Sequence, residues 1–141
     1  MPTINDIRVA LANTLKASIS GIQISPWLLG GPTPPVLQIV SGPLDYDGTF
    51  GASAQKDYQF KVQGMIGLAT DIGAQKRLGD LSDPNGPKSV WAAIAADHTL
   101  GGVVLFANVI SASEEMVYNI AAERPQVIGR EWIVEIEAPG A

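Results

Sequence analysis

Two stretches of the chain alternate apolar and polar residues with the two-residue period of a β-strand. In the stretch Lys56–Leu68, the apolar residues that share one parity are Tyr58, Phe60, Val62, Ile66 and Leu68. In the stretch Arg130–Ala138, Trp132, Val134 and Ile136 alternate with Glu131, Glu135 and Glu137. Successive side chains of a strand point to opposite faces of a sheet. Both stretches therefore predict strands with one apolar and one polar face.

Three stretches are predicted to be helices. The first is Thr3–Ser18, where Thr3 and Asp6 resemble a capping box with Asp in place of the usual Glu. The second is capped by Asp71 and runs through Leu81. The third begins at Pro87 and is broken at Leu100-Gly101-Gly102.

Shorter apolar stretches predict three more strands, at Ile22–Ser25, Val36–Ser41 and Val103–Ser111. A polar connection containing Glu114, Glu115, Glu123 and Arg124 is expected before the last strand. The resulting order is α-β-β-β-α-α-β-β. Strands grouped on either side of a helical pair indicate an α+β fold, with a largely antiparallel sheet and helices packed on one face. At roughly 150 residues per domain, 141 residues predict a single domain over residues 1–141.

Composition excludes several classes of protein. The chain has no cysteine, which removes disulfide frameworks, cysteine zinc sites and thiol nucleophiles. Its formal net charge of −5 disfavours binding to phosphate backbones, which relies on Lys and Arg. Only 16% of the residues are charged, against about 25% in typical soluble domains. A surface so poor in charge suggests that part of it is buried in an assembly.

The sequence also bears on where the protein is made. No apolar stretch approaches the ~20 residues that cross a bilayer. The first residues, Met1 to Asp6, lack the basic and apolar regions of a signal peptide. We therefore expect a soluble protein with no membrane partner, made inside the cell.

Four candidate chemical sites have simpler explanations. Gly79–Ser89 does not fit a phosphate-binding loop, because six residues separate its glycines and Pro87 lacks an N–H donor. Asp45, Asp47 and Gly48 lack the spacing and the closing Glu of a calcium loop. His98, the only histidine, is expected to interact with a helix C-terminus, with a catalytic base as the alternative. The glutamates Glu131, Glu135 and Glu137 share one face and favour a solvated or subunit-facing acidic stripe over a glycosidase pair. We expect no catalytic residue, no cofactor and no metal.

Other residues are candidates for an interface. The segment 42–54 is long for a loop in a compact domain, and its aromatics Tyr46 and Phe50 are expected either to anchor a contact or to cover the protein's own core. Trp27 lies in a stretch rich in Pro and Gly and is expected at an interface. Trp91 and Trp132 have the periodicity of core positions.

Taken over nearly its whole length, the sequence resembles the tail terminator proteins of long-tailed actinobacterial phages. The likeness is carried by Ile4-Asn5-Asp6-Ile7, Ile24-Ser25-Pro26, Pro34-Pro35, Tyr46 with Phe50, Leu81-Ser82-Asp83-Pro84-Asn85-Gly86, Ser89-Val90 with Ala93-Ile94, and Leu100-Gly101-Gly102. None of these is a catalytic signature. The resemblance implies an α+β fold and a structural virion protein that is not an enzyme.

The resemblance also implies partners and a location. Tail terminators form a hexameric ring at the head-proximal end of the tail tube, stop tube polymerisation and provide the docking surface for the head connector or stopper. The expected partners are thus further copies of the chain, the tail tube protein and the head–tail connector, in a virion assembled in the host cytoplasm. DNA would pass through the ring unbound, and the stripe Glu131, Glu135 and Glu137 could line the pore and repel phosphates. A stopper or minor tail protein, and an enzyme or ligand-binding domain using His98, are the alternatives.

Overall fold

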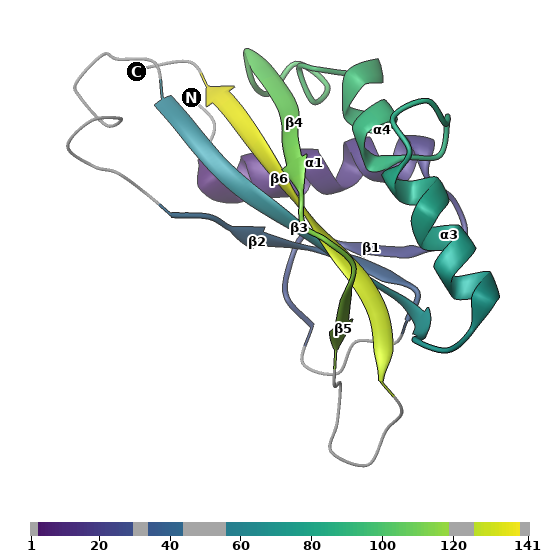
Figure 1. The fold of residues 1–141 in the computed structure, drawn as a ribbon. Coiled ribbons are helices and arrows are strands. Elements are labelled where there is room, and N and C mark those ends of the chain that lie inside the picture. Colours follow the sequence, from purple (N-terminus) through teal and green to yellow (C-terminus); the bar gives the residue numbers. More distant parts are fainter. Residues whose placement is uncertain (1–2, 30–33, 44–55, 119–125, 139–141) are drawn as a thin grey trace.

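The computed structural model describes residues 3–29, 34–43, 56–118 and 126–138. Its elements, in chain order, are α1 (Ile4–Ser18), β1 (Gln23–Ser25), β2 (Val36–Ser41), β3 (Lys56–Leu68), α3 (Ile72–Ser82), α4 (Val90–Ala96), β4 (Phe106–Ala112), β5 (Met116–Tyr118) and β6 (Val127–Ala138). The strands form one sheet with helices beside it (Figure 1). The α+β class predicted from the sequence is confirmed.

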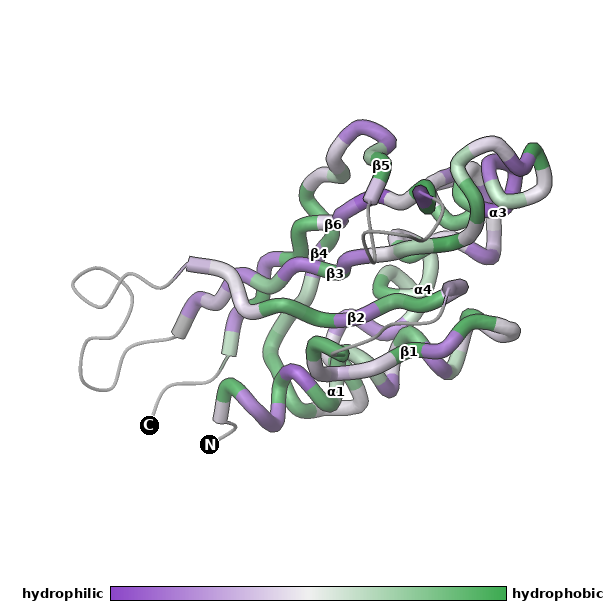
Figure 2. Tube along the Cα trace, turned by 90° about the horizontal axis from the view of Figure 1, so that it is seen from below, coloured by the Kyte–Doolittle hydropathy of each residue, from purple (hydrophilic) through white to green (hydrophobic). Residues whose placement is uncertain are grey.

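The sheet is built around its two longest strands, β3 and β6, which pair antiparallel from Lys56↔Ala138 to Leu68↔Val127. The strand order is β1-β2-β3-β6-β4, and β5 pairs with the far end of β6. Figure 2 shows β6, β3, β2 and β1 side by side in this order. Only β1 and β2 run parallel, so the sheet is largely antiparallel, as expected.

The helices and one face of the sheet bury the main hydrophobic core. α1 contacts β1 and β2, α3 contacts β3 and β6, and α4 contacts β4. The largest fully buried side chains include Phe60, Leu11, Leu78, Ile94 and Ile136. On β3 and β6 the core residues are those with the parity of Phe60 and Ile136. The alternation in the sequence therefore identified the buried face correctly.

A second, smaller cluster lies on the opposite face of the sheet. It consists of Val36, Met65 and Val127, with Leu29 and Tyr118 packed against it. Met65 faces Val36 on β2 and Gly129 on β6. On the face of the sheet away from the helices, Leu29 and the β5 residue Tyr118 thus cover this end. The rest of that face carries polar side chains.

Two element boundaries differ from the prediction because local hydrogen bonds override the apolar pattern. α4 begins at Val90 and not at Pro87, since the Ser89 side chain accepts a hydrogen bond from Ala92 N at 3.0 Å and acts as the N-cap. β4 begins at Phe106 and not at Val103. A turn delays it, with φ of 50° at Leu100, 75° at Gly101 and 90° at Gly102.

Two features of the C-terminal half were not predicted. β6 begins at Val127, three residues before the expected start, and β5 lies within the segment expected to be only a polar connection. β5 has three residues, and its Met116 and Tyr118 face Gly129 and Val127. A strand this short has no readable alternation, so only its pairing with β6 defines it.

Candidate interaction surfaces

Trp27 forms an exposed ledge beside β1, at one edge of the sheet. Its side chain is 44% exposed and the neighbouring Leu28 is 56% exposed. The Arg8 guanidinium lies 5.0 Å from the centroid of the Trp27 ring and also donates hydrogen bonds to Pro26 O and Ile39 O. Ser25 fixes the chain here, since its hydroxyl accepts from Trp27 N at 3.1 Å and donates to Trp27 O at 2.8 Å. The indole is therefore held outward by a cation–π contact and a local turn.

β4 forms the opposite edge of the sheet, and His98 covers part of it. Ala107 N donates to His98 O at 2.7 Å, and His98 Nδ1 lies 2.9 Å from Ala107 O. The imidazole also stacks on Phe106, with ring centroids 4.7 Å apart and planes 16° apart. Because a carbonyl oxygen only accepts, Nδ1 must carry a proton. The expected role of His98 at a helix end is therefore replaced by one at the sheet edge, just beyond α4.

Beyond Ala107, no described strand pairs with the outer edge of β4, which is therefore called the open edge, and an apolar groove borders it. A β-bulge between Val109 and Ser111 leaves Ile110 without a partner on β6, and its side chain is 45% exposed. The groove has a volume of about 260 Å³ and is lined by Ser82, Pro84, Trp91, Val109, Ile110, Ser111, Ala112 and Trp132. Trp132 is buried as predicted, but the prediction that Trp91 is a core residue was wrong. Trp91 is 44% exposed and forms one wall of the groove.

A chain of polar side chains crosses the face of the sheet away from the helices. Leu29 N donates to Gln38 Oε1 at 3.1 Å, Gln38 Nε2 to Gln63 Oε1 at 2.8 Å, and Gln63 Nε2 to Glu131 Oε2 at 3.2 Å. At the end of this series of hydrogen bonds, Lys61 Nζ forms an ion pair with Glu131 Oε1 at 3.5 Å. The charge of Glu131 is thus neutralised by Lys61, and its carboxylate accepts a hydrogen bond from Gln63. It therefore does not contribute a free negative charge to the predicted acidic stripe.

Tyr118 adjoins this network. Burial, with the nearby Glu131 charge as a second cause, raises the pKa of Tyr118 to about 12. Its hydroxyl also lies 3.5 Å from Met116 Sδ. The phenol therefore stays protonated beside the carboxylate over the physiological range.

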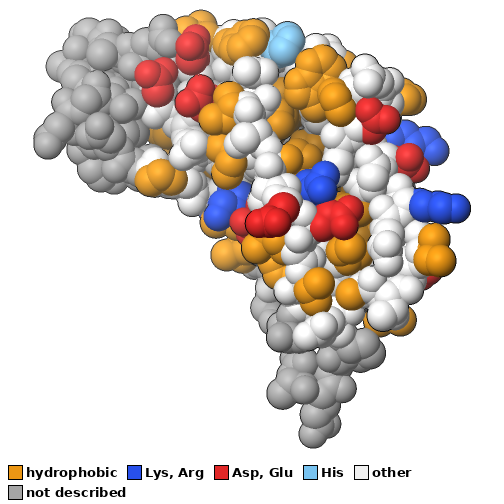
Figure 3. All heavy atoms as spheres, viewed as in Figure 1, with side chains coloured by type: hydrophobic (Ala, Val, Ile, Leu, Met, Phe, Trp, Pro, Cys, Tyr) orange, Lys and Arg blue, Asp and Glu red, His pale blue; other side chains and the backbone are white. Residues whose placement is uncertain are grey.

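The other two glutamates of the predicted stripe have a different environment. Glu135 faces Gln59 and Asn108, and Glu137 faces Asp57 and Phe106. With Asp57 they border a shallow hollow of about 250 Å³ between β3 and β6. Figure 3 shows carboxylates gathered at this end of the sheet, where β3 begins and β6 ends. The three glutamates share one face, as predicted, but the acidic surface is formed by Glu135, Glu137 and Asp57.

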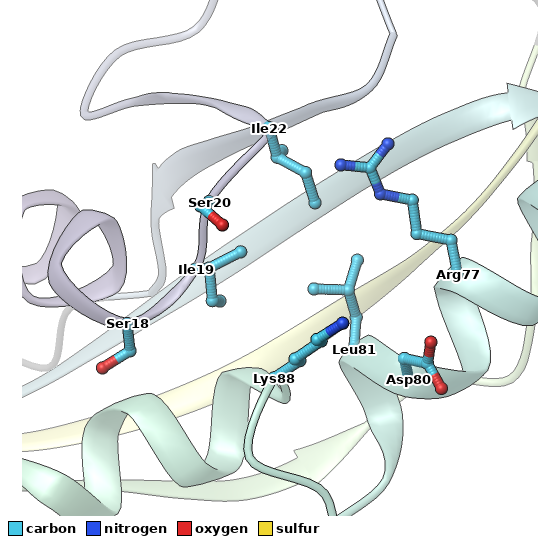
Figure 4. A pocket seen from close by; sticks show the side chains of 8 residues that line it. All are labelled: Ser18, Ile19, Ser20, Ile22, Arg77, Asp80, Leu81 and Lys88. Carbon is cyan, nitrogen blue, oxygen red and sulfur yellow. The ribbon is translucent and has the colours of Figure 1, made fainter.

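A hollow of about 220 Å³ lies between the end of α1, the start of β1 and α3 (Figure 4). Arg77 and Lys88 approach it on either side of Leu81, and Asp80 lies beside them. Arg77 Nη2 donates to Gly21 O at 2.7 Å. The volume is below the roughly 300–1,000 Å³ of small-molecule sites, and the lining mixes both charges. We assign it no ligand.

Several predicted features cannot be placed or have no geometric counterpart. Tyr46, Phe50 and the aspartates Asp45 and Asp47 lie outside the described residues. In the part of the chain that the structure describes, no three His, Asp or Glu side chains lie close enough together to hold a metal ion. Among the same residues, no helix is long and apolar enough to cross a membrane.

Two comparisons with known proteins, one by family and one with curated proteins, found no match. No known protein family matches the chain, and no curated protein is significantly similar to it. Inference about function therefore depends on the surfaces described above and on the resemblance in the sequence.

Proposed function

We propose that the chain is a structural virion protein that forms a ring at the head-proximal end of a phage tail tube, ends tube polymerisation and offers a docking surface to the head connector. The observation that carries the proposal is the pair of unlike apolar surfaces at the two sheet edges. One edge carries the Trp27–Leu28 ledge, and the other carries the groove of Trp91 and Ile110. The sequence resemblance to tail terminators supports the same assignment.

Two unlike surfaces on one subunit suit a ring. A two-fold dimer brings identical patches together, whereas a cyclic assembly joins two different patches head to tail and closes by rotation. An open edge strand with exposed apolar residues is an aggregation hazard for a monomer, so such edges are normally covered. In a ring, the neighbouring subunits would cover these edges and so prevent aggregation through them. The hexameric order remains an expectation from the resemblance.

The acidic end of the sheet supports passage of DNA without binding. Glu135 and Glu137 lie on one face at this end of the sheet, and a surface of this sign repels phosphates. We propose that this end faces the lumen of the ring, with Glu131 excluded because it is paired with Lys61. Tyr46 and Phe50 remain the proposed anchors of an axial contact with the tail tube or the connector.

The environment of His98 supports a structural role over the enzyme alternative. Its Nδ1 is committed to Ala107 O and its ring is stacked on Phe106. Four hollows lined by described residues measure 210–260 Å³, below the usual size of small-molecule sites. These features favour assembly.

The proposal is tested by adding the purified protein to polymerising tail tube protein. We expect the final tube length to fall as the molar ratio of this chain to tube protein rises, and a gold label on the chain to mark one end of each tube. Tube lengths that stay constant at every ratio, with label absent from the ends, would contradict it. Labelled ends on tubes of unchanged length would favour a stopper or minor tail protein.

A further inference from the structure

The unlike sheet edges also differ in charge. Two arginines bracket β1: Arg77 binds Gly21 O just before the strand, and Arg8 binds Pro26 O just after it. Both use backbone carbonyls, so neither charge is neutralised by its hydrogen bonds. The Arg8 guanidinium thus places a positive charge directly beside the Trp27–Leu28 ledge, and Arg77 lies with Asp80 at the other end of β1.

The open half of β4 is bordered instead by carboxylates. Asp83 lies between Ser82 and Pro84, which line the groove, and Glu114 follows two residues after Ala112 at the end of the strand. Both carboxylate-bearing residues are exposed. Over the described residues, the ion pairs are Lys61–Glu131 and Arg130–Glu115, and neither pair includes one of these two carboxylates or one of the two arginines.

The two edges cannot meet within one molecule. β1 and β4 are the first and last strands in the order β1-β2-β3-β6-β4. Four inter-strand spacings of about 4.8 Å place them roughly 19 Å apart. A contact between these two surfaces therefore requires a second molecule.

We propose that the Trp27–Leu28 ledge of one copy packs into the Trp91–Ile110 groove of the next copy, against the open half of β4. The proposal rests on the ring function proposed above and identifies the contact between its subunits. The indole supplies a projecting aromatic anchor, and the groove supplies an apolar slot between a helix and an edge strand. Arginine-bracketed β1 then faces the carboxylates beside β4, which orients the contact and disfavours ledge-to-ledge or groove-to-groove pairing.

His98 fixes where the contact begins on β4. It occupies the edge at Ala107, so the open edge starts beyond this residue, where Ile110 bulges outward. The ledge of the neighbouring copy is thereby directed to the groove and away from Phe106. The contact combines one aromatic anchor and one open strand segment with two arginines on the ledge side that face two carboxylates on the groove side.

A mixing experiment tests the head-to-tail direction. Trp27→Ala removes the aromatic side chain of the ledge and leaves the groove intact. Ile110→Asp places a carboxylate in the apolar groove and leaves the ledge intact. We expect each variant to weaken self-association by about 30-fold or more, the range of aromatic hot spots. A mixture of the two should give 1:1 dimers by native mass spectrometry and nothing larger, because only one intact interface remains. Ile72→Ala, at a side chain 66% exposed on α3, is the matched control and should assemble normally.

Cross-linking gives a second measurement that does not depend on a strong complex. The chain has no cysteine, so Leu28→Cys and Ile110→Cys variants can be oxidised without background. We expect a disulfide-linked pair between the two variants, in solution or on assembled tails, and none when Ile72→Cys replaces either. Absence of the 28–110 link in both settings, or dimers of the Ile110→Asp variant alone, would overturn the proposal. If the 28–110 link is absent but tails still end at their normal length, the proposed contact is wrong and the proposed ring function still stands. If the link forms but the protein has no effect on tail length, the proposed ring function is wrong.

Discussion

His98 binds Ala107 through both its backbone and its side chain, with Ala107 N donating to His98 O at 2.7 Å and Nδ1 lying 2.9 Å from Ala107 O. The segment after α4 thus closes the first part of the β4 edge. Natural sheets protect their edges by such coverage. The remaining edge, beyond Ala107, is where the account places a neighbouring subunit.

Replacing this histidine tests the coverage. His98→Ala removes one hydrogen bond and the stacking on Phe106, and we expect the free energy of unfolding to fall by roughly 1–2 kcal/mol. The longer open edge should also increase light scattering at high concentration. Urea denaturation and static light scattering measure the two effects. Unchanged stability and scattering would show that His98 does not protect the edge.

The core is tight at Gly64. A Cβ there would lie 2.8 Å from Leu37 Cδ2 and 3.0 Å from Trp132 Cζ3, so we expect Gly64→Ala to cost about 1–3 kcal/mol of unfolding free energy. Gly79 is the control, since a Cβ on this residue of α3 meets nothing within 4 Å. Gly79→Ala should stabilise the protein by about 0.5–1 kcal/mol. Thermal and urea unfolding of both variants measure the difference, and equal effects would contradict the packing described here.

Tyr118 predicts a loss of stability at alkaline pH. Its pKa rises from 10.0 in the reference state to about 12 in the folded protein. Above pH 10 the unfolded chain loses this proton while the folded chain keeps it, so the free energy of unfolding falls between pH 10 and about 12. Tyr118→Phe should remove this part of the slope, measured as the difference from wild type in urea midpoints. Parallel profiles for the two proteins would be inconsistent with a buried phenol beside Glu131.

The acidic end of the sheet predicts an effect on DNA exit. Glu137→Lys replaces a carboxylate that would repel phosphates with an attracting ammonium, so triggered particles should release DNA more slowly, most clearly at low salt. Asp80→Lys makes the same charge change on α3 and should leave the rate unaltered. The rate is measured by dye fluorescence as DNA leaves the particle. Equal rates for the two variants would place the acidic end away from the lumen.

The local parts of the fold were predictable where short-range chemistry decides the structure. Thr3 and Asp6 form the predicted capping box, with Thr3 N donating to Asp6 Oδ2 at 2.9 Å and Asp6 N to Thr3 Oγ1 at 3.1 Å. Asp71 caps α3, and the bounds of β2 and β3 agree with the prediction. Each depends on residues a few positions apart or on a long, regular alternation.

The candidate surfaces were less predictable because tertiary contacts determine them. Ile110 is exposed only because a bulge shifts the register after Val109. Trp91 has helical core spacing, yet its side chain is exposed, because no described strand lies beyond β4 in the sheet to cover that side of α4. Pairing of Glu131 with Lys61 likewise depends on the β3–β6 register, which parity alone does not specify. Trp27 was expected at an interface because of its Pro- and Gly-rich surroundings; its side chain is exposed, and its place at an interface stays a prediction.

The most direct test of the central claim is the tail-length distribution, by negative-stain electron microscopy, of particles assembled with and without this protein. The account predicts overlong or headless tails in its absence and normal tails when the protein is added back. Tails of normal length that fail to join heads would assign the chain to the neck, and normal infectious particles made without it would contradict the account.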